Sequence, residues 1–440
     1  MDVPVTRDHD EAAGARTQPA GATERPGESA ASMPCCRNCG AALHETFADL
    51  GMTPLANSYV APEGRNAAEP YYPLHALVCA ECKLVQLAQF ESPQAIFGEY
   101  LYFSSFSDSW LRHAADHAAA MIRRWGLGTA DEVVEVASND GYLLQYFKAA
   151  GIPVLGVDPA ANVAQAAIAK GIPTEIAFFG AATARRLREA GHAPRLMCAN
   201  NVFAHVPDVH DFAEGFRILL APDGVLTVEF PHLLVLMQEN QFDTIYHEHF
   251  SYFSLMAAER VWARHDMVVF DVERLPTHGG SLRLYLRHMG DSSKPVTGAV
   301  ADLRVAEAMA ALDRLETYRR FADGVVTAKC DLLEFLVTAK RQGKRIAGYG
   351  APAKGNTLLN YCGVGPEFVE FTVDRSPHKQ GMLLPGTRIP IRAPEAILAA
   401  RPDYVLILPW NLREEIAQQM AAVRSWGGRF VTAIPRVEVF

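Results

Sequence analysis

The stretch Val133-Val-Glu-Val-Ala-Ser-Asn-Asp-Gly141 contains the pattern that decides the fold of this 440-residue chain. Its apolar start is typical of a buried strand, and its small, polar end is typical of a turn. A helical segment, Gly141–Ala150, and a second strand-like run, Val154–Asp158, follow directly. Strand, turn, helix and strand in this order form the repeating unit of an open α/β sheet, so we predict an α/β fold.

The α/β pattern continues toward the C-terminus and then occurs a second time. Further strands of the first unit are predicted at Arg195–Asn200, Gly224–Phe230 and, as a hairpin, Met267–Val272 with Ser281–Arg287. Residues 296–342 are rich in Ala, Leu, Arg and Glu at helical spacing, which predicts long helices that bridge two lobes. A second α/β unit is predicted from four strand-like runs, Arg345–Tyr349, Val369–Asp374, Tyr404–Leu408 and Arg429–Thr432.

Length and composition narrow the class of protein. A chain of 440 residues exceeds one hydrophobic core, so two or three domains are expected, and the Ala- and Gly-rich residues 1–33 are predicted to be a disordered tail. The net charge of -9 argues against a protein whose main work is to neutralise nucleic-acid phosphates. No apolar run reaches the roughly 18 to 20 residues of a membrane span. We expect a cytoplasmic monomer without nucleic-acid or membrane partners.

Two Cys-x-x-Cys pairs, Cys36-Arg-Asn-Cys39 and Cys79-Ala-Glu-Cys82, mark the N-terminal part of the chain. Four thiolates from two such pairs can form the tetrahedral shell that zinc prefers. We predict a structural zinc ion held by Cys36, Cys39, Cys79 and Cys82, because four cysteines leave no position open for a water molecule. Cys35 could replace Cys36 as a ligand, and a redox dithiol is the weaker alternative.

The turn that follows Val136 has the features of a cofactor site. In an open α/β sheet the ligand lies at the carboxyl ends of the strands, where small residues let the backbone approach it and an acid after the next strand accepts ribose hydroxyls. This pattern favours S-adenosylmethionine as the ligand. The alternative is an ordinary turn that binds nothing, because Ala137 and Asn139 stand where a dinucleotide site would have glycine. The residues assigned to this site are Glu135, Ala137, Asn139, Gly141, Asp158, Pro159, Asn200 and Asn201.

A third motif, Tyr246-His-Glu-His249, lies downstream of Asn200-Asn-Val-Phe-Ala-His205. Removal of a proton from a carbon next to a ketone requires a base with a pKa near neutrality and donors for the enolate oxygen. His and Tyr can supply both, and a Glu between two His can orient an imidazole. The alternatives are a surface metal-binding cluster and a buried hydrogen-bond network without chemistry. The motif is not the HExxH of zinc proteases, because one residue separates its histidines.

The fourth motif, Gly348-Tyr-Gly-Ala-Pro-Ala-Lys-Gly355, lies between a predicted strand and a predicted helix. Backbone N–H groups at such a helix start, together with a lysine, form an anion site that suits a diphosphate. A structural turn is the alternative, because the motif matches neither the Walker pattern nor a clean dinucleotide fingerprint. Trp410 follows a later strand and could stack on a base. We assign Gly350, Ala351, Lys354, Asn356 and Trp410 to substrate binding.

These motifs, in this order from Cys36 to the C-terminus, resemble those of the nucleotide-sugar C-methyltransferases. The resemblance implies a small zinc-binding module (34–90), a central Rossmann-like class I methyltransferase domain (91–295) and a second Rossmann-like α/β domain for the nucleotide sugar (296–440). It also implies S-adenosylmethionine and structural zinc as cofactors. The substrate implied is a nucleotide-linked 4-keto-deoxysugar, with dTDP as the nucleotide, that is methylated at carbon 3.

The resemblance further implies roles for individual residues. His249 is the base that removes the proton at sugar carbon 3, and around it lie Tyr246, Glu248, His205 and Tyr100. Tyr100 rests on the local match Phe97-Gly-Glu-Tyr-Leu-Tyr-Phe-Ser-Ser105. The chain departs from the family pattern at Ala137, where glycine is common, and in its N-terminal tail.

Two other functions are consistent with parts of the sequence. An NAD(P)-dependent nucleotide-sugar oxidoreductase would use the second α/β unit and bind a ribose through Asp374. A non-catalytic binding protein built on the zinc module would keep the α/β lobes without their chemistry. The negative net charge and the intact Tyr246–His249 motif argue against the non-catalytic protein.

Overall fold

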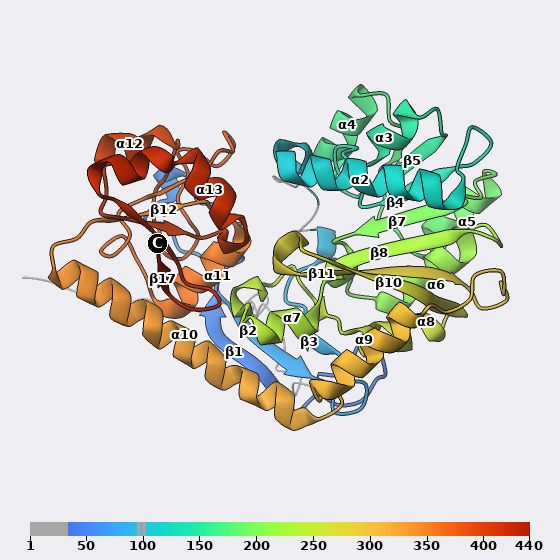
Figure 1. Cartoon of the computed structure of the whole chain (residues 1–440), viewed down its shortest axis with the longest axis horizontal. Coiled ribbons are helices and arrows are strands. Elements are labelled where there is room, and N and C mark those ends of the chain that lie inside the picture. The colour runs from blue at the N-terminus through green and yellow to red at the C-terminus, as the bar shows by residue number, and fades with distance from the viewer. Residues whose placement is uncertain (1–33, 95–97, 99–102) are drawn as a thin grey trace, which may run out of the picture. The chain divides into compact units, whose positions relative to one another are not determined.

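The computed structural model describes residues 34–94, 98 and 103–440, and these contain three β-sheets (Figure 1). Two of the sheets are α/β sheets with mainly parallel strands, and the third is a small antiparallel sheet near the N-terminus. The predicted α/β fold with two Rossmann-like units and an N-terminal cysteine module is thereby confirmed. The predicted tail, residues 1–33, lies outside the described residues.

The central sheet has seven strands in the order β10-β11-β8-β7-β4-β5-β6. Its strands are β4 (Val133–Val136), β5 (Val154–Val157), β6 (Thr174–Glu175), β7 (Leu196–Asn200), β8 (Val225–Pro231), β10 (Met267–Leu275) and β11 (Ser281–His288). The first five are parallel, and the β10–β11 hairpin closes one edge, where β11 pairs antiparallel with β8. Because β5 and β7 flank β4, the chain changes direction there, and the turn after β4 lies at the topological switch point.

The helices of the central unit precede or connect these strands. They are α2 (Asp108–Trp125), α3 (Leu144–Ala149), α4 (Ala161–Ala169), α5 (Ala181–Glu189), α6 (Val209–Leu219), α7 (Leu233–Gln238) and α8 (Leu255–Ala263). The strands β4, β7 and β8 are almost continuously buried, as expected of a parallel sheet covered on both faces. Short apolar runs such as Val133–Val136 could therefore be recognised as strands.

The N-terminal sheet contains β1 (Glu45–Thr53), β2 (Tyr72–Val78), β3 (Val85–Leu87) and β9 (Ser251–Tyr252). Its fourth strand comes from the middle of the chain and pairs antiparallel with β3. The Leu87 amide also donates to the carbonyl oxygen of Phe250 at 3.0 Å. The zinc module thus holds the segment that directly follows the Tyr246–His249 motif.

The C-terminal sheet has the order β14-β13-β12-β15-β16-β17, and only β17 is antiparallel. Its strands are β12 (Ile346–Tyr349), β13 (Thr372–Val373), β14 (Ile391–Arg392), β15 (Tyr404–Ile407), β16 (Arg429–Thr432) and β17 (Glu438–Val439), and its helices are α11 (Ala353–Cys362), α12 (Glu395–Ala400) and α13 (Arg413–Gln419). The strand predicted at 369–374 is short, since Pro390, beside the start of β14, has no N–H to extend the ladder.

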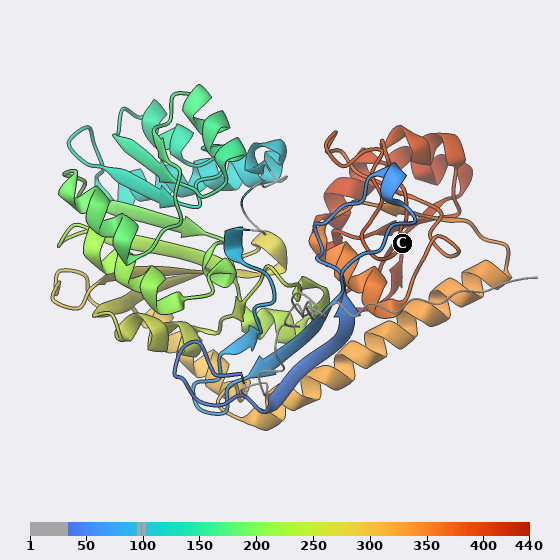
Figure 2. The same ribbon diagram turned by 180° about the vertical axis from the view of Figure 1, so that it is seen from behind.

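The helices predicted between residues 296 and 342 are α9 (Gly298–Met309) and α10 (Leu315–Arg341). The buried face of α10 recurs every three or four residues, at Tyr318, Phe321, Val325, Ala328, Leu332, Leu336 and Ala339. This stripe packs on β1 and α11, and β1 runs along α10 in both views (Figures 1 and 2). Within 34–94 and 103–440, none of the helices combines the length and apolar composition that a membrane span requires.

A buried carboxylate joins α9 to the start of α8. Glu307 is 3% exposed and accepts hydrogen bonds from the Leu255 and Met256 amides at 2.6 and 3.0 Å. It also accepts one from Nε2 of His232 at 2.8 Å. Negative charge at a helix N-terminus is favourable, and a buried charge with three donors is well satisfied.

We predict that Glu307→Gln lowers the free energy of unfolding by about 2 to 3 kcal/mol. The substitution removes the buried negative charge and places an NH2 group, which cannot accept, next to backbone N–H donors. Urea unfolding followed by circular dichroism measures the effect. Asp302→Asn, on the exposed side of the same helix, is the matched control and should change stability by less than about 0.5 kcal/mol. Equal effects of both substitutions would contradict the role of Glu307.

Candidate active site and zinc module

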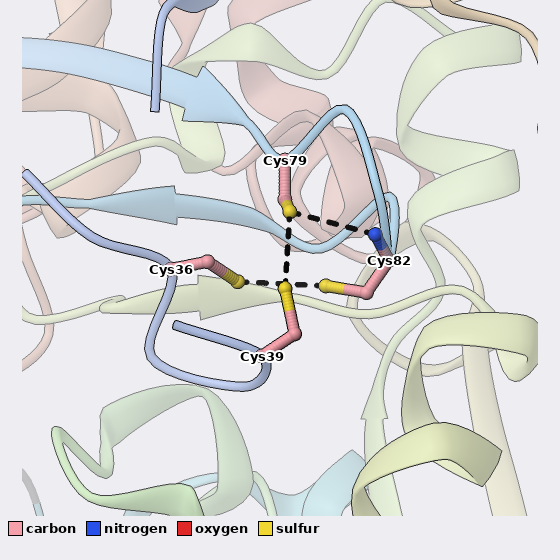
Figure 3. A group of neighbouring side chains, drawn as sticks. All are labelled: Cys36, Cys39, Cys79 and Cys82. Carbon is pink, nitrogen blue, oxygen red and sulfur yellow. Dashed lines mark hydrogen bonds between the residues drawn. The ribbon is translucent and has the colours of Figure 1, made fainter. Parts of the chain in front are cut away.

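The four predicted zinc ligands converge in the structure (Figure 3). The Sγ atoms of Cys36, Cys39, Cys79 and Cys82 all lie within 4.8 Å of one another, and the Cys36–Cys82 and Cys39–Cys79 pairs are 3.4 Å apart. Tetrahedral ligation by thiolates at about 2.3 Å requires sulfur separations of about 3.8 Å, so these residues fit zinc. Cys35 is exposed and lies outside this group, which assigns the ligand position to Cys36.

The cysteine group is structural in character. A shell of four thiolates has no position for a substrate or a water molecule. Among the described residues it is also the one group of Cys, His, Asp and Glu side chains that brings at least three ligand atoms together. The structure therefore does not support the alternative of a metal-binding cluster at His247–His249.

We predict about one zinc ion per chain, lost in Cys36→Ser and retained in Cys35→Ser, because only the first substitution removes a thiolate from the group. Metal analysis of the dialysed proteins measures the stoichiometry. Cys36→Ser should also melt at a lower temperature, since zinc binding contributes to folding. Loss of zinc from Cys35→Ser with retention in Cys36→Ser would reverse the assignment.

The residues assigned to the cofactor gather at the carboxyl ends of β4, β5 and β7. Asp158 follows β5 and accepts hydrogen bonds from the amides of Asn139 at 2.8 Å and Ala160 at 2.9 Å, so it ties the first turn to the loop that contains Pro159. Burial raises the pKa of Asp158, while the two backbone hydrogen bonds oppose this effect. The buried Glu135 has a pKa raised well above its usual value, again chiefly by burial.

The backbone of the first turn is left-handed at several positions. Ala137, Asn139 and Gly141 have φ values of 58°, 50° and 77°. A Cβ atom on Gly141 would lie 2.3 Å from Cδ1 of Ile172, so only glycine fits there. Ala137 adopts a conformation that costs an L-residue roughly 1 to 2 kcal/mol, which explains physically why glycine would suit this position.

Two asparagines beside the turn have polar atoms without partners among the described residues. The Oδ1 atoms of Asn200 and Asn201 are buried and accept no hydrogen bond there. Buried polar atoms are nearly always satisfied, so these two acceptors are suited to donors of a bound ligand. With Glu135 and Asp158 they give the switch point a set of acceptors that fits the ammonium and hydroxyl groups of S-adenosylmethionine.

The centre of the candidate active site is a hydrogen-bonded pair, Tyr246 and His249. Nδ1 of His249 lies 2.9 Å from the Thr244 carbonyl oxygen, which can only accept, so Nδ1 bears the proton. Nε2 consequently bears the lone pair, which accepts from the Tyr246 hydroxyl at 2.8 Å. Burial, and then the neighbouring His205, lower the pKa of His249 well below its usual value, so this imidazole is uncharged near neutral pH.

His205 lies beside this pair. Its ring centroid is 4.7 Å from that of His249, and its Nδ1 donates to the Glu248 carbonyl oxygen at 2.8 Å. Burial lowers the pKa of His205 to about 4. Two uncharged imidazoles and a phenol are thus brought together from distant segments.

The other members of the Tyr246–His249 motif point elsewhere. Both carboxylate oxygens of Glu248 accept from Nδ2 of Asn57 at 2.8 Å, so this carboxylate orients an amide of the zinc module rather than an imidazole. Burial raises the pKa of Glu248 to about 7. Nε2 of His247 lies 3.2 Å from the Pro73 carbonyl oxygen, on the side of the zinc module. Tyr100 lies outside the described residues.

A second polar group connects this site to the C-terminal unit. Nε1 of Trp410 donates to Asp243 at 2.7 Å, and Nζ of Lys354 lies 4.5 Å from the centroid of the Trp410 ring. Burial raises the pKa of Asp243 to about 6 and lowers that of Lys354, and their mutual attraction opposes both shifts. Nζ of Lys354 also donates to Oδ1 of Asn411 at 2.9 Å.

The Gly-rich turn after β12 lies at the switch point of the C-terminal sheet. Gly350 has φ 90°, and a Cβ atom there would lie 2.5 Å from Cδ of Pro409. The Ala351 amide donates to Asp374 at 2.8 Å. Asn356 instead donates to the Ala56 carbonyl oxygen of the zinc module at 2.6 Å, so it does not join Lys354 and Trp410 in one group.

An open pocket of about 470 Å³ lies beside this turn. Its lining includes Tyr349 at the end of β12, Arg375 after β13, and Pro394 after β14. These residues share the carboxyl edge of the sheet, where open α/β sheets bind their ligands. The pocket offers an aromatic ring and a guanidinium group to a ligand.

Several residues near the sites were not predicted from sequence. Asp243 lies three residues before the predicted Tyr246–His249 motif, but the sequence did not predict its contact with Trp410. Asn57 and Arg375 have no local pattern that distinguishes them from ordinary loop residues. The same holds for a buried ion network in which Glu229 accepts from Arg283 and contacts His113 at 2.7 and 3.0 Å.

The fold and its sites define an S-adenosylmethionine-dependent methyltransferase with a zinc-binding module and a second α/β domain. Three family models match consecutive parts of the chain: a zinc binding domain at residues 36–97, a methyltransferase domain at 108–271 and a C-methyltransferase C-terminal domain at 276–435.

The chain belongs to the C-methyltransferase family. It is 38% identical over 407 residues to the C-methyltransferase NovU of Streptomyces niveus, covering 92% of this chain and 96% of the relative. Membership in this family favours a methyltransferase over the oxidoreductase and over the non-catalytic binding protein.

Among solved structures, the chain is similar to PH0226 protein from Pyrococcus horikoshii OT3 (14% identity, 45% of this chain and 99% of that chain, TM-score 0.35). It is also similar to magnesium protoporphyrin IX methyltransferase from Synechocystis (14% identity, 40% of this chain and 79% of that chain, TM-score 0.31).

Proposed function

We propose that this C-methyltransferase acts on carbon 3 of a nucleotide-linked 4-keto-deoxysugar, with dTDP as the nucleotide. The observation that carries the proposal is the Tyr246–His249 pair, in which Nε2 of an uncharged, buried imidazole is an acceptor. Such a nitrogen can take up a proton from a carbon that a neighbouring ketone acidifies. The family relationship supports transfer to carbon but does not identify the sugar.

In the proposed reaction, the ketone oxygen of the substrate first takes over the hydrogen bond of the Tyr246 hydroxyl, which leaves the Nε2 lone pair of His249 open. His249 then accepts the proton of carbon 3 at Nε2 and becomes an imidazolium, while the phenol donates to the enolate oxygen. S-adenosylmethionine supplies the methyl group, and the electron pair left on carbon 3 forms the new carbon–carbon bond while sulfur keeps the pair of the broken bond. His205 and Tyr100 are proposed to complete the pocket around the sugar, and Glu248 is proposed to position this segment through its hydrogen bonds with Asn57.

The C-terminal unit, residues 296–440, is proposed to bind the nucleotide. The turn at Gly350 and Ala351 opens α11, whose first N–H groups and Lys354 suit a diphosphate. The pocket that contains Arg375 is large enough for part of a nucleoside. Trp410 of the C-terminal unit donates to Asp243, which lies three residues before Tyr246. This contact supports a substrate that extends from the carboxyl edge of the C-terminal sheet to the Tyr246–His249 pair. Residues 34–90 and 91–295 are proposed to act as the zinc and methyltransferase domains.

We predict that the purified protein adds one methyl group to a nucleotide-linked 4-keto sugar, because only a ketone neighbour makes the carbon acidic enough for an imidazole base. Mass measurement after incubation of a panel of such sugars with S-adenosylmethionine reads out the transfer. The corresponding sugars with a 4-hydroxyl group are the matched controls and should remain unmodified. Methylation of the 4-hydroxy sugars alone would refute the proposal.

We predict that His249→Asn lowers kcat by about 10²- to 10⁴-fold, since asparagine keeps hydrogen-bonding capacity but cannot take up the proton. Calorimetry should find the affinity for S-adenosylmethionine unchanged. His44→Asn, at an exposed position, is the control and should retain wild-type turnover. A kcat of His249→Asn within tenfold of wild type would remove this residue from the role of base.

A further inference from the structure

The turn between β10 and β11 contains a histidine in a conformation that side chains seldom adopt. His278 has φ 54° and ψ 19°, in the left-handed region. Glycine or asparagine adopts this region at lower cost than histidine. Strained residues of this kind persist only where the surrounding structure determines their backbone, and they concentrate at functional sites.

The surroundings of His278 do hold the turn on both sides. The Thr277 hydroxyl donates to Glu229 at 2.9 Å, and Nε2 of Gln241 donates to the Gly279 carbonyl oxygen at 2.8 Å. A Cβ atom on Gly279 would lie 2.4 Å from the Trp410 ring. The turn therefore fits closely between the ion network of Glu229 and the C-terminal unit, and the backbone of His278 has little freedom to relax.

The imidazole of His278 has an unsatisfied nitrogen. Its ring centroid lies 5.1 Å from that of Trp110, and its Nε2 is buried without a hydrogen-bond partner among the described residues. Burial, followed by the charge of Lys354, lowers the pKa of His278 to about 4, so the ring is uncharged near neutral pH. Charge on His278 in turn disfavours charge on His249, which indicates that the two rings are electrostatic neighbours.

Packing alone does not account for this arrangement. A left-handed backbone and an unpaired buried nitrogen each cost stability, and either would be relieved by glycine. A strained backbone, a rigidly supported turn and a ring nitrogen without a partner among the described residues instead suit a side chain that is preorganised to bind a ligand atom.

We propose that His278 is a catalytic residue that donates a hydrogen bond from Nε2 to the ketone oxygen of the substrate and holds the enolate oxygen during methyl transfer. The inference rests on the proposed function, in which a ketone is next to the methylated carbon. An uncharged imidazole can act as such a donor, and a donor fixed before the reaction needs no reorganisation when charge develops. His278 and the Tyr246 hydroxyl would then form the two donors for this oxygen.

The test compares His278→Gly and His278→Asn with wild type, using a nucleotide-linked 4-keto sugar that the wild-type enzyme methylates. His278→Gly should lower kcat by about 10²- to 10³-fold, because a fixed donor to the oxyanion is lost. His278→Asn should recover at least about tenfold of that loss, because its amide can donate from the same left-handed backbone. The affinity for S-adenosylmethionine should remain at the wild-type value in both.

Arg401→Gly is the matched control, since Arg401 is exposed, has φ 48° and ends α12. This substitution removes left-handed backbone strain at the end of α12, away from the carboxyl edges of the sheets, and should leave kcat unchanged. All variants should melt within about 3 °C of wild type, so a lost turnover is not a lost fold. If His278→Gly does not fold, His278→Asn alone provides the comparison, and a kcat at or above one hundredth of wild type is then the expected result.

Two outcomes overturn the role of His278: wild-type turnover in His278→Gly, or an asparagine variant no more active than the glycine variant. Neither outcome affects the proposed function, because wild-type methylation of the keto sugar remains. Failure of the wild-type enzyme to methylate any 4-keto sugar would overturn the proposed function, and the role of His278 with it.

Discussion

The hydrogen bond from Nδ1 of His249 to the Thr244 carbonyl oxygen is the constraint on which the candidate site depends. A carbonyl oxygen cannot donate, so this bond of 2.9 Å fixes the tautomer and makes Nε2 the nitrogen that bears the lone pair. Burial then keeps the ring uncharged, because a buried imidazolium would be poorly solvated. Position, tautomer and charge of the proposed base thus follow from one short backbone segment, residues 244–249.

Two parts of the chain outside the central unit hold this segment in place. The zinc module pairs its β3 with β9, directly after His249, and its Asn57 binds the Glu248 carboxylate. The C-terminal unit contributes Trp410, which binds Asp243. A zinc ion with four thiolate ligands has no position for a substrate, but it links the loop before β1 to the loop between β2 and β3. The metal therefore acts on the site through the fold.

The sequence predicted the α/β units well, because buried parallel strands form continuous apolar runs and α10 repeats its apolar positions every three or four residues. It also predicted the cysteine group, whose spacing is specific to a metal shell. The sheet of the zinc module was missed, although Leu74, Ala76 and Val78 alternate inward in β2. Contacts such as Asn57 with Glu248 join residues 191 positions apart, and no local pattern encodes them. Such tertiary contacts, rather than motif order, decided that the Glu248 carboxylate binds Asn57 instead of an imidazole.

Proton removal at carbon 3 can be measured without methyl transfer. The wild-type enzyme is incubated in deuterated water with a nucleotide-linked 4-keto sugar and S-adenosylhomocysteine, and NMR follows the hydrogen at carbon 3. If the uncharged Nε2 of His249 is the base, this position exchanges with solvent in the wild-type enzyme and not in His249→Asn. Exchange at the wild-type rate in His249→Asn would show that another group removes the proton.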